Sequence, residues 1–187
     1  METRITLTEG NIKMLMESQQ SLDGHIRDDL GITDSQWKFN LETNHHLALE
    51  IEKAEFINEC FDAWKYWKRK PVTMEKILDE AVDVIHFCFI LINKDMLGKP
   101  GAEKTIKRQM DNYIKWYAGD NLKAEPLIST HPHIFMLNYL NENNASPIQI
   151  LAKTLMILNR YGFLNEHVIA QYEIKNGVNH ERIEQGY

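Results

Sequence analysis

Apolar residues recur at intervals of three and four positions near the start of the chain, and one polar residue belongs to the series. The positions are Ile12, Leu15, Met16, Gln19, Leu22 and Ile26. Side chains with this spacing lie on one face of an α-helix. The pattern predicts an amphipathic first helix, followed by a polar and aperiodic loop over residues 28–44.

The next two helices are predicted from the same periodicity and from their end signals. We expect the second over about residues 44–68, ended by Pro71, because the interior of a helix does not accommodate proline. The third is expected over about 73–93, with Thr73 as its N-cap. These two helices carry the residues on which the functional hypothesis rests.

The rest of the chain also favours helices. Ser146 followed by Pro147 is typical of a helix start, and Gly177 is expected to interrupt the last helix. The expected helices cover residues 102–118, 132–142, 146–161 and 165–176, with a long connection over 119–132. Since no segment alternates with the period of a strand, we predict an all-α bundle of about five to seven helices with a four-helix core. Residues 1–187 are expected to form one domain.

The charge and composition of the chain restrict the classes of partner that it can bind. The chain has 27 acidic and 21 basic residues, a formal net charge of −6, which disfavours nucleic acid. No apolar run approaches the ~18–20 residues of a membrane span, and the first residues lack the apolar segment of a secretory signal. Cys60 and Cys88 lie among apolar residues, which favours reduced thiols. We therefore expect a cytoplasmic protein, bacterial or phage-encoded, with no membrane partner.

Two pairs of acidic residues stand in unusual surroundings. Glu52 and Glu55, like Glu80 and Asp83, are spaced to share a helix face. Asp83 lies within the apolar run 81–92, where an isolated carboxylate must be protonated, paired or bound to a cation. If the two helices pack together, the four acids can share Mg2+, with Mn2+ as a substitute, since both prefer oxygen ligands. The competing interpretation is ordinary salt bridges to lysines such as Lys53 and Lys76.

The acidic pairs belong to a set of five motifs that together resemble a known family. The pattern E-x-x-E then E-x-x-D is similar to that of the MazG-like all-α nucleoside triphosphate pyrophosphatases. The full set resembles, more specifically, the dimeric all-α dUTPase family. The matching stretches are QQSLD (19–23), AEFI (54–57), WKYWK (64–68), EAVDVIHF (80–87) and the run from KNGVNHER (175–182) to the terminal Gly-Tyr.

The resemblance implies a homodimeric enzyme that hydrolyses dUTP, and also dUDP, to dUMP with Mg2+, releasing pyrophosphate from dUTP. It implies metal ligation by Glu52, Glu55, Glu80 and Asp83, with Glu52 or Glu55 also receiving a proton from the attacking water. The residues expected to bind substrate are Gln20, Asp23, Trp64, Lys65, Lys68, His86, Phe87, Lys175, Asn179, Arg182 and Tyr187. For the dimer, the exposed side of Met14, Met16, Phe135, Met136 and Tyr139 is the expected contact.

One departure from the family pattern keeps alternatives open. Asp23 stands where the family usually has Asn, and a carboxylate can accept a hydrogen bond from an amino group that uracil lacks. A related pyrophosphatase that prefers dCTP or a modified nucleotide is therefore a second hypothesis. A non-catalytic helical interaction protein with the same fold is a third.

Overall fold

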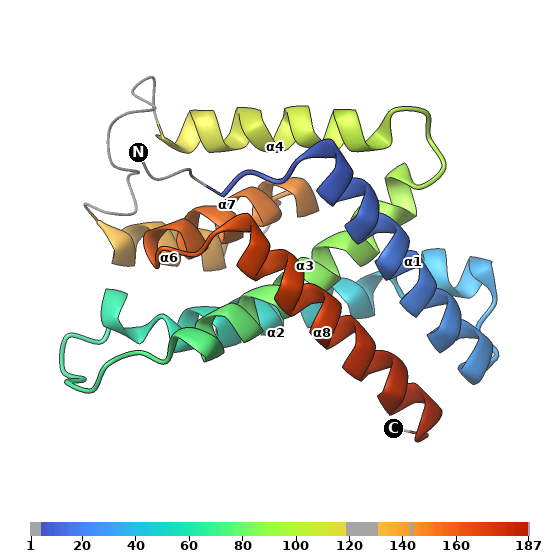
Figure 1. The fold of residues 1–187 in the computed structure, drawn as a ribbon, viewed down its shortest axis with the longest axis horizontal. Helices are drawn as coiled ribbons and strands as arrows, with labels where there is room; N and C mark the ends of the chain where they lie inside the picture. The colour runs from blue at the N-terminus through green and yellow to red at the C-terminus, as the bar shows by residue number, and fades with distance from the viewer. Residues whose placement is uncertain (1–4, 119–130, 143, 187) are drawn as a thin grey trace.

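The structure is a computed structural model that describes residues 5–118, 131–142 and 144–186. Within these ranges it contains helices and no strand, so the predicted all-α fold is confirmed. Figure 1 shows the α-helices, which are α1 (Glu9–Leu30), α2 (Glu42–Glu59), α3 (Met74–Met96), α4 (Ala102–Ala118), α6 (Pro132–Asn141), α7 (Pro147–Arg160) and α8 (Asn165–Glu184). None of the helices in the described ranges combines the length and the apolar character needed to cross a membrane.

Helix α3 occupies the centre of the bundle (Figure 1). It packs most extensively against α2 and also contacts α1, α7 and α8. Its sequence is apolar on nearly every side, and such a helix is stable only when it is covered all round. Asp83 is therefore held partly buried, between residues on either side of it that are fully covered by the neighbouring helices.

The first helix and the segment after it differ from the prediction. Helix α1 continues to Leu30 and ends at Gly31, whose φ of 63° is the left-handed conformation typical of a glycine at a helix end. The expected loop over 28–44 is wrong in its extent, because a π-helical turn, η1 (Gln36–Asn40), and the start of α2 lie within it. The ring of Trp37 packs at 4.5 Å from that of His45, which anchors this turn on α2.

The second helix is shorter than predicted. It ends at Glu59 instead of residue 68, and a short 3-10 turn, η2 (Phe61–Ala63), follows. The indole Nε1 of Trp64 donates to the Ile57 carbonyl oxygen at 3.0 Å, so the side chain satisfies a backbone acceptor of the last helical turn. Pro71 is therefore not the residue that ends the helix.

The last helix is longer than predicted, since α8 runs through Gly177 to Glu184. Gly177 is absent from the glycines with positive φ, so it keeps a helical conformation. Tyr172 is fully buried, and α8 packs against α1 and α3, which stabilises the helix beyond what local propensity alone provides. The predicted start of α7 is confirmed, because Ser146 Oγ accepts from the Gln149 N–H at 3.2 Å and Pro147 follows.

The predicted start of α3 is only partly confirmed. Thr73 occupies the N-cap position of α3, but its side chain makes no capping hydrogen bond. Helix α8 begins at Asn165, as expected, and Leu164 is its N-cap.

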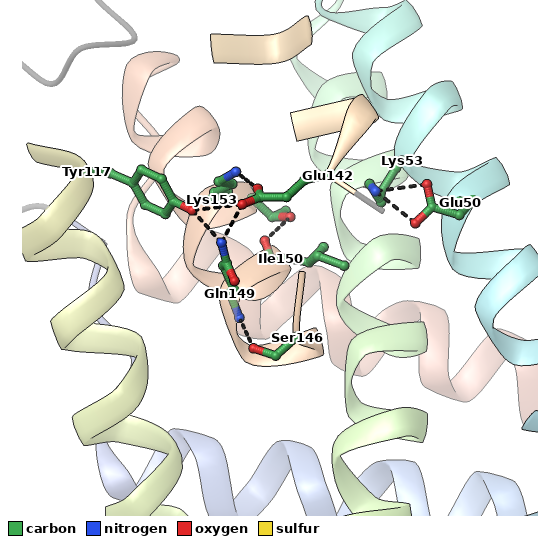
Figure 2. A network of polar contacts seen from close by, with 9 residues as sticks. Glu50, Lys53, Tyr117, Glu142, Ser146, Gln149, Ile150 and Lys153 are labelled. Atoms are coloured by element: carbon green, nitrogen blue, oxygen red, sulfur yellow. Dashed lines mark hydrogen bonds and ion pairs between the residues drawn. The ribbon is translucent and has the colours of Figure 1, made fainter. Parts of the chain in front are cut away.

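Two buried lysines, Lys53 on α2 and Lys153 on α7, each pair with a glutamate (Figure 2). Lys53 is fully buried and donates to both carboxylate oxygens of Glu50, at 2.8 and 2.9 Å. Lys153 is buried and forms an ion pair with Glu142, whose other oxygen accepts from Gln149 at 2.6 Å. Burial lowers the pKa of Lys153 to about 8. The contacts of Glu142 with Lys153 and Gln149 fix α7 relative to the end of α6.

Two further sequence interpretations are settled by burial. Cys60 and Cys88 are free and buried, as predicted. The apolar set expected to contact a second subunit is packed inside the chain instead, so this rationale for a dimer is wrong. Met16, Phe135, Met136 and Tyr139 are buried, and Met14 is partly buried against the core.

Candidate active site

Three of the four predicted acids converge between α2 and α3. Glu52, Glu80 and Asp83 each offer a carboxylate oxygen, and these oxygens lie within 4.8 Å of one another. All three residues are partly buried. The fourth acid, Glu55, is exposed and lies outside this group, one helical turn after Glu52. We call the group of three the acidic cluster.

Burial and mutual repulsion disfavour the ionised forms of the cluster. Burial, together with the charges of Asp83, Glu55 and Glu80, raises the pKa of Glu52 to about 7. Burial is also the main cause of the raised pKa values of Glu80 and Asp83. The cluster therefore holds more negative charge than its surroundings stabilise, which favours binding of a cation.

A lysine of α8 brings a positive charge to the cluster. The Lys175 ammonium contacts the Asp83 carboxylate, and it lies 3.1 Å from both Oδ2 and the backbone oxygen of Asp79. Lys53, which the competing interpretation paired with these acids, is bonded to Glu50. The acidic cluster is thus not one of the ordinary salt bridges expected on a solvated helix face.

A pocket of about 310 Å³ opens beside the cluster, between α1, α3 and α8. Asp83 belongs to both, since it also lines the pocket. Six of the twelve lining side chains are apolar and six are polar or charged, and such a mixture suits a small-molecule site. The residues that line it are Gln19, Leu22, Ile26, Asp29, Leu30, Asp83, His86, Phe87, Ile90, Asn179, Arg182 and Ile183.

Several predicted substrate-binding residues lie at this pocket. His86, Phe87, Asn179 and Arg182 line it, and Lys175 reaches its edge through Asp83. Asn179 Oδ1 accepts from Arg182 Nη1 at 3.4 Å.

The structure places the remaining predicted residues elsewhere. Gln20 is exposed and lines a separate surface hollow, together with His25 and His180. The turn after α2 contains Trp64, Lys65 and Lys68, none of which lines the pocket beside the cluster. Lys65 Nζ donates to Asn58 Oδ1 at 2.8 Å, and Lys68 lies over the ring of Phe61. Tyr187 lies outside the described residues.

Asp23 is buried near the pocket but is not one of its lining residues. It accepts a hydrogen bond from Gln19 Nε2 at 2.8 Å, and Gln19 itself lines the pocket. Burial raises the pKa of Asp23 to about 7. Asp23 therefore contacts the pocket through Gln19.

Sequence reasoning selected Gln20 and missed Gln19. Gln19 Oε1 lies 2.8 Å from His86 Nδ1 and 2.8 Å from the Tyr172 hydroxyl. A signal was present, because Gln19 is the polar member of the apolar series that predicted α1. A polar side chain on a buried helix face must find hydrogen-bond partners in the interior. Tyr172 and Asp79 carried no comparable signal.

The fold and the site define an all-α protein in which a carboxylate cluster, able to bind a metal ion, lies beside a pocket of small-molecule size. Comparison with protein families agrees, since the dUTPase family profile matches residues 11–187. The chain belongs to the dUTPase family, and its activity is that of a dUTP diphosphatase. A search of curated proteins gives no match.

Proposed function

We propose that this dUTPase hydrolyses dUTP to dUMP and pyrophosphate with Mg2+, accepts dUDP as well, and uses the acidic cluster and its pocket as the active site. The observation that carries the proposal is the convergence of Glu52, Glu80 and Asp83, of which Asp83 also lines the pocket. A triphosphate is a polyanion that bare carboxylates repel, so an acidic site for this substrate requires cations.

The residues present fit a divalent metal ion. The donors are carboxylate oxygens from two helices, and the cluster contains no sulfur or imidazole, which favours Mg2+, or Mn2+ in its place. Glu52, Glu80 and Asp83 would hold the ion, and Glu55 is placed to join them from the next turn of α2. When bound, the metal neutralises phosphate charge and lowers the pKa of a water molecule.

The chain's own groups supply binding and proton transfer. Arg182 can donate two parallel hydrogen bonds to phosphate oxygens, and Lys175 adds a positive charge at Asp83. Phe87 offers an aromatic face to a base in the pocket. Glu52 or Glu55 is proposed to take the proton from the attacking water.

Other parts of the proposal rest on the family resemblance. These are assembly as a homodimer, a cytoplasmic location, and roles in substrate binding for Gln20, Trp64, Lys65, Lys68 and Tyr187. Trp64, Tyr66 and Trp67 are exposed beside several basic residues, which leaves them accessible to a nucleotide or to a second subunit.

A turnover panel tests the proposal. All deoxynucleoside triphosphates and dUDP are assayed with and without Mg2+, with chelator as the control. We expect dUTP to be preferred, with dUMP and pyrophosphate as products and loss of turnover under chelation. A preference for dCTP would instead support the second hypothesis drawn from Asp23, and turnover unaffected by chelation would refute the metal assignment.

A further inference from the structure

A chain of buried hydrogen bonds connects Asp23 to the pocket. It runs from Asp23 Oδ1 to Gln19 Nε2, and from Gln19 Oε1 to both His86 Nδ1 and the Tyr172 hydroxyl, each at 2.8 Å. All four side chains are buried, and they come from α1, α3 and α8, the helices that form the pocket.

The direction of each hydrogen bond follows from that of its neighbour. The Asp23 carboxylate only accepts when it is ionised, so Gln19 turns its amide N–H groups toward Asp23. Gln19 Oε1 must then accept from His86 Nδ1–H and from Tyr172 O–H. His86 is consequently the tautomer with its proton on Nδ1, and its Nε2 is a hydrogen-bond acceptor.

The Nε2 atom of His86 is the end of this chain of hydrogen bonds at the pocket. It is buried and has no hydrogen-bond partner among the described residues, although His86 lines the pocket. The imidazole stacks on the Tyr172 ring with centroids 4.0 Å apart and planes 19° from parallel, which holds the ring orientation. Burial lowers the pKa of His86 to about 3, so the ring stays neutral around pH 7.

The same atoms can form a second complete arrangement. If Asp23 takes up a proton, it can donate to Gln19, whose terminal amide then rotates by half a turn. The amide N–H groups donate to His86 Nδ1 and to the Tyr172 oxygen, and His86 carries its proton on Nε2. Tyr172 retains an acceptor for its own proton, because the Leu15 carbonyl oxygen lies 3.5 Å from the hydroxyl.

From this geometry we infer that Asp23 is a positioning residue: its ionisation, passed through Gln19, determines whether His86 Nε2 faces the pocket as a hydrogen-bond acceptor or as a donor. An acceptor matches the imide N–H of uracil, and a donor matches the ring N3 of cytosine. The device deepens the proposed function, and its link to base selection rests on that function. The relay itself requires only the free protein.

Burial and the charges around Asp23 together give it a pKa near neutral pH, where the folded protein can be titrated. Arg27 on α1 and Lys94 on α3 favour the carboxylate, as does the hydrogen bond from Gln19, while burial opposes it. Tyr172 is the titratable group that faces it from α8, and burial raises the pKa of Tyr172 well above its usual value. The balance leaves the pKa of Asp23 at about 7.

The test is the tautomer of His86, measured by long-range proton–nitrogen correlation spectra of labelled free protein between about pH 5 and about pH 9. His86→Gln identifies the signal. We expect the ratio of the Nδ1–H form of His86 to its Nε2–H form to rise about tenfold per pH unit near the midpoint of the Asp23 titration. Asp23→Asn should abolish this change, whereas Asp29→Asn, which removes another carboxylate at the pocket, should preserve it. A constant tautomer in the wild-type protein would overturn the relay, as would a pH response that persists in Asp23→Asn.

A second readout tests base selection. The ratio of kcat/KM for dUTP to that for dCTP should rise with pH in the wild-type enzyme and stay flat in Asp23→Asn. If the tautomer of His86 changes with pH while this ratio does not, the proposal that His86 selects the base is refuted. Absence of any dUTP turnover would contradict the proposed function, and the free-protein titration would still decide the relay.

Discussion

The Lys175 ammonium on α8 lies against the Asp83 carboxylate on α3, the residue shared by the acidic cluster and the pocket. This ion pair places a fixed positive charge where the proposed metal ion would bind. It also gives Asp83 a partner in the interior, since an isolated charge there would be strongly unfavourable. Lys175 and the metal are therefore expected to compete for the same oxygen atoms.

Substitution of Lys175 should affect metal and substrate in opposite directions. Lys175→Met removes a competing cation, so we expect Mg2+ to bind the nucleotide-free protein several-fold more tightly. The same change removes a phosphate-binding charge, so the KM for dUTP should rise. Calorimetric Mg2+ titration and steady-state kinetics measure the two effects. Lys13→Met, an exposed lysine on α1, is the matched control; equal Mg2+ affinity in both variants would contradict the competition.

Removal of one cluster charge should strongly reduce activity and stabilise the metal-free fold. Glu52→Gln is expected to lower turnover by about 100-fold or more. At about pH 8 it should raise the free energy of unfolding by about 1 kcal/mol, a value reduced for solvent screening of a half-exposed group. Urea unfolding with chelator and a dUTP assay measure both. Glu42→Gln, exposed at the start of α2, should change neither.

The stability of the protein should depend on pH through Asp23. Its folded pKa, about 7, exceeds the usual 3.8, so the folded state binds the proton more tightly than the unfolded chain. The resulting stabilisation is present below about pH 4 and is lost as the pH rises to about 7. Asp23→Asn should therefore stabilise the protein at about pH 8 by an amount on the order of 3 kcal/mol. Urea unfolding at about pH 5 and pH 8 measures this difference, which should be larger at the higher pH.

The Lys53–Glu50 pair predicts an asymmetry between its two members. Lys53 is fully buried, whereas the Glu50 side chain is 47% exposed. Lys53→Met leaves a carboxylate that water can solvate, so we expect a loss of stability below about 1 kcal/mol. Glu50→Ala leaves a buried ammonium without its partner and should cost about 3 kcal/mol. Equal losses in the two variants, measured by urea unfolding, would contradict this account.

The elements that could be predicted from sequence are those with strong periodicity and clear end signals. The apolar face of α3 and the Ser146–Pro147 start of α7 are examples. The end of α2 could not be predicted, because it depends on the Trp64 indole reaching a carbonyl seven residues earlier. The continuation of α8 through Gly177 depends on its packing against two other helices, which local propensity does not describe.

The candidate site could likewise be predicted from the sequence only in part. The spacing and apolar setting of the acids led to the group formed by Glu52, Glu80 and Asp83. The pairing of Lys175 with Asp83 joins residues far apart in the chain, and no spacing rule reports such a contact. The choice between Gln19 and Gln20 required knowing which side of α1 faces α3, and the position of Gln19 in the apolar series already indicated that side.

Lys175, Asn179 and Arg182 follow one another at intervals of four and three along α8, so a single rigid rod carries the contact to Asp83 and two residues of the pocket wall. A tilt of α8 changes the contact to Asp83 and the pocket wall together. Binding of a ligand at one of these two places should therefore change the affinity for a ligand at the other, and thermodynamic reciprocity makes the factor the same in both directions.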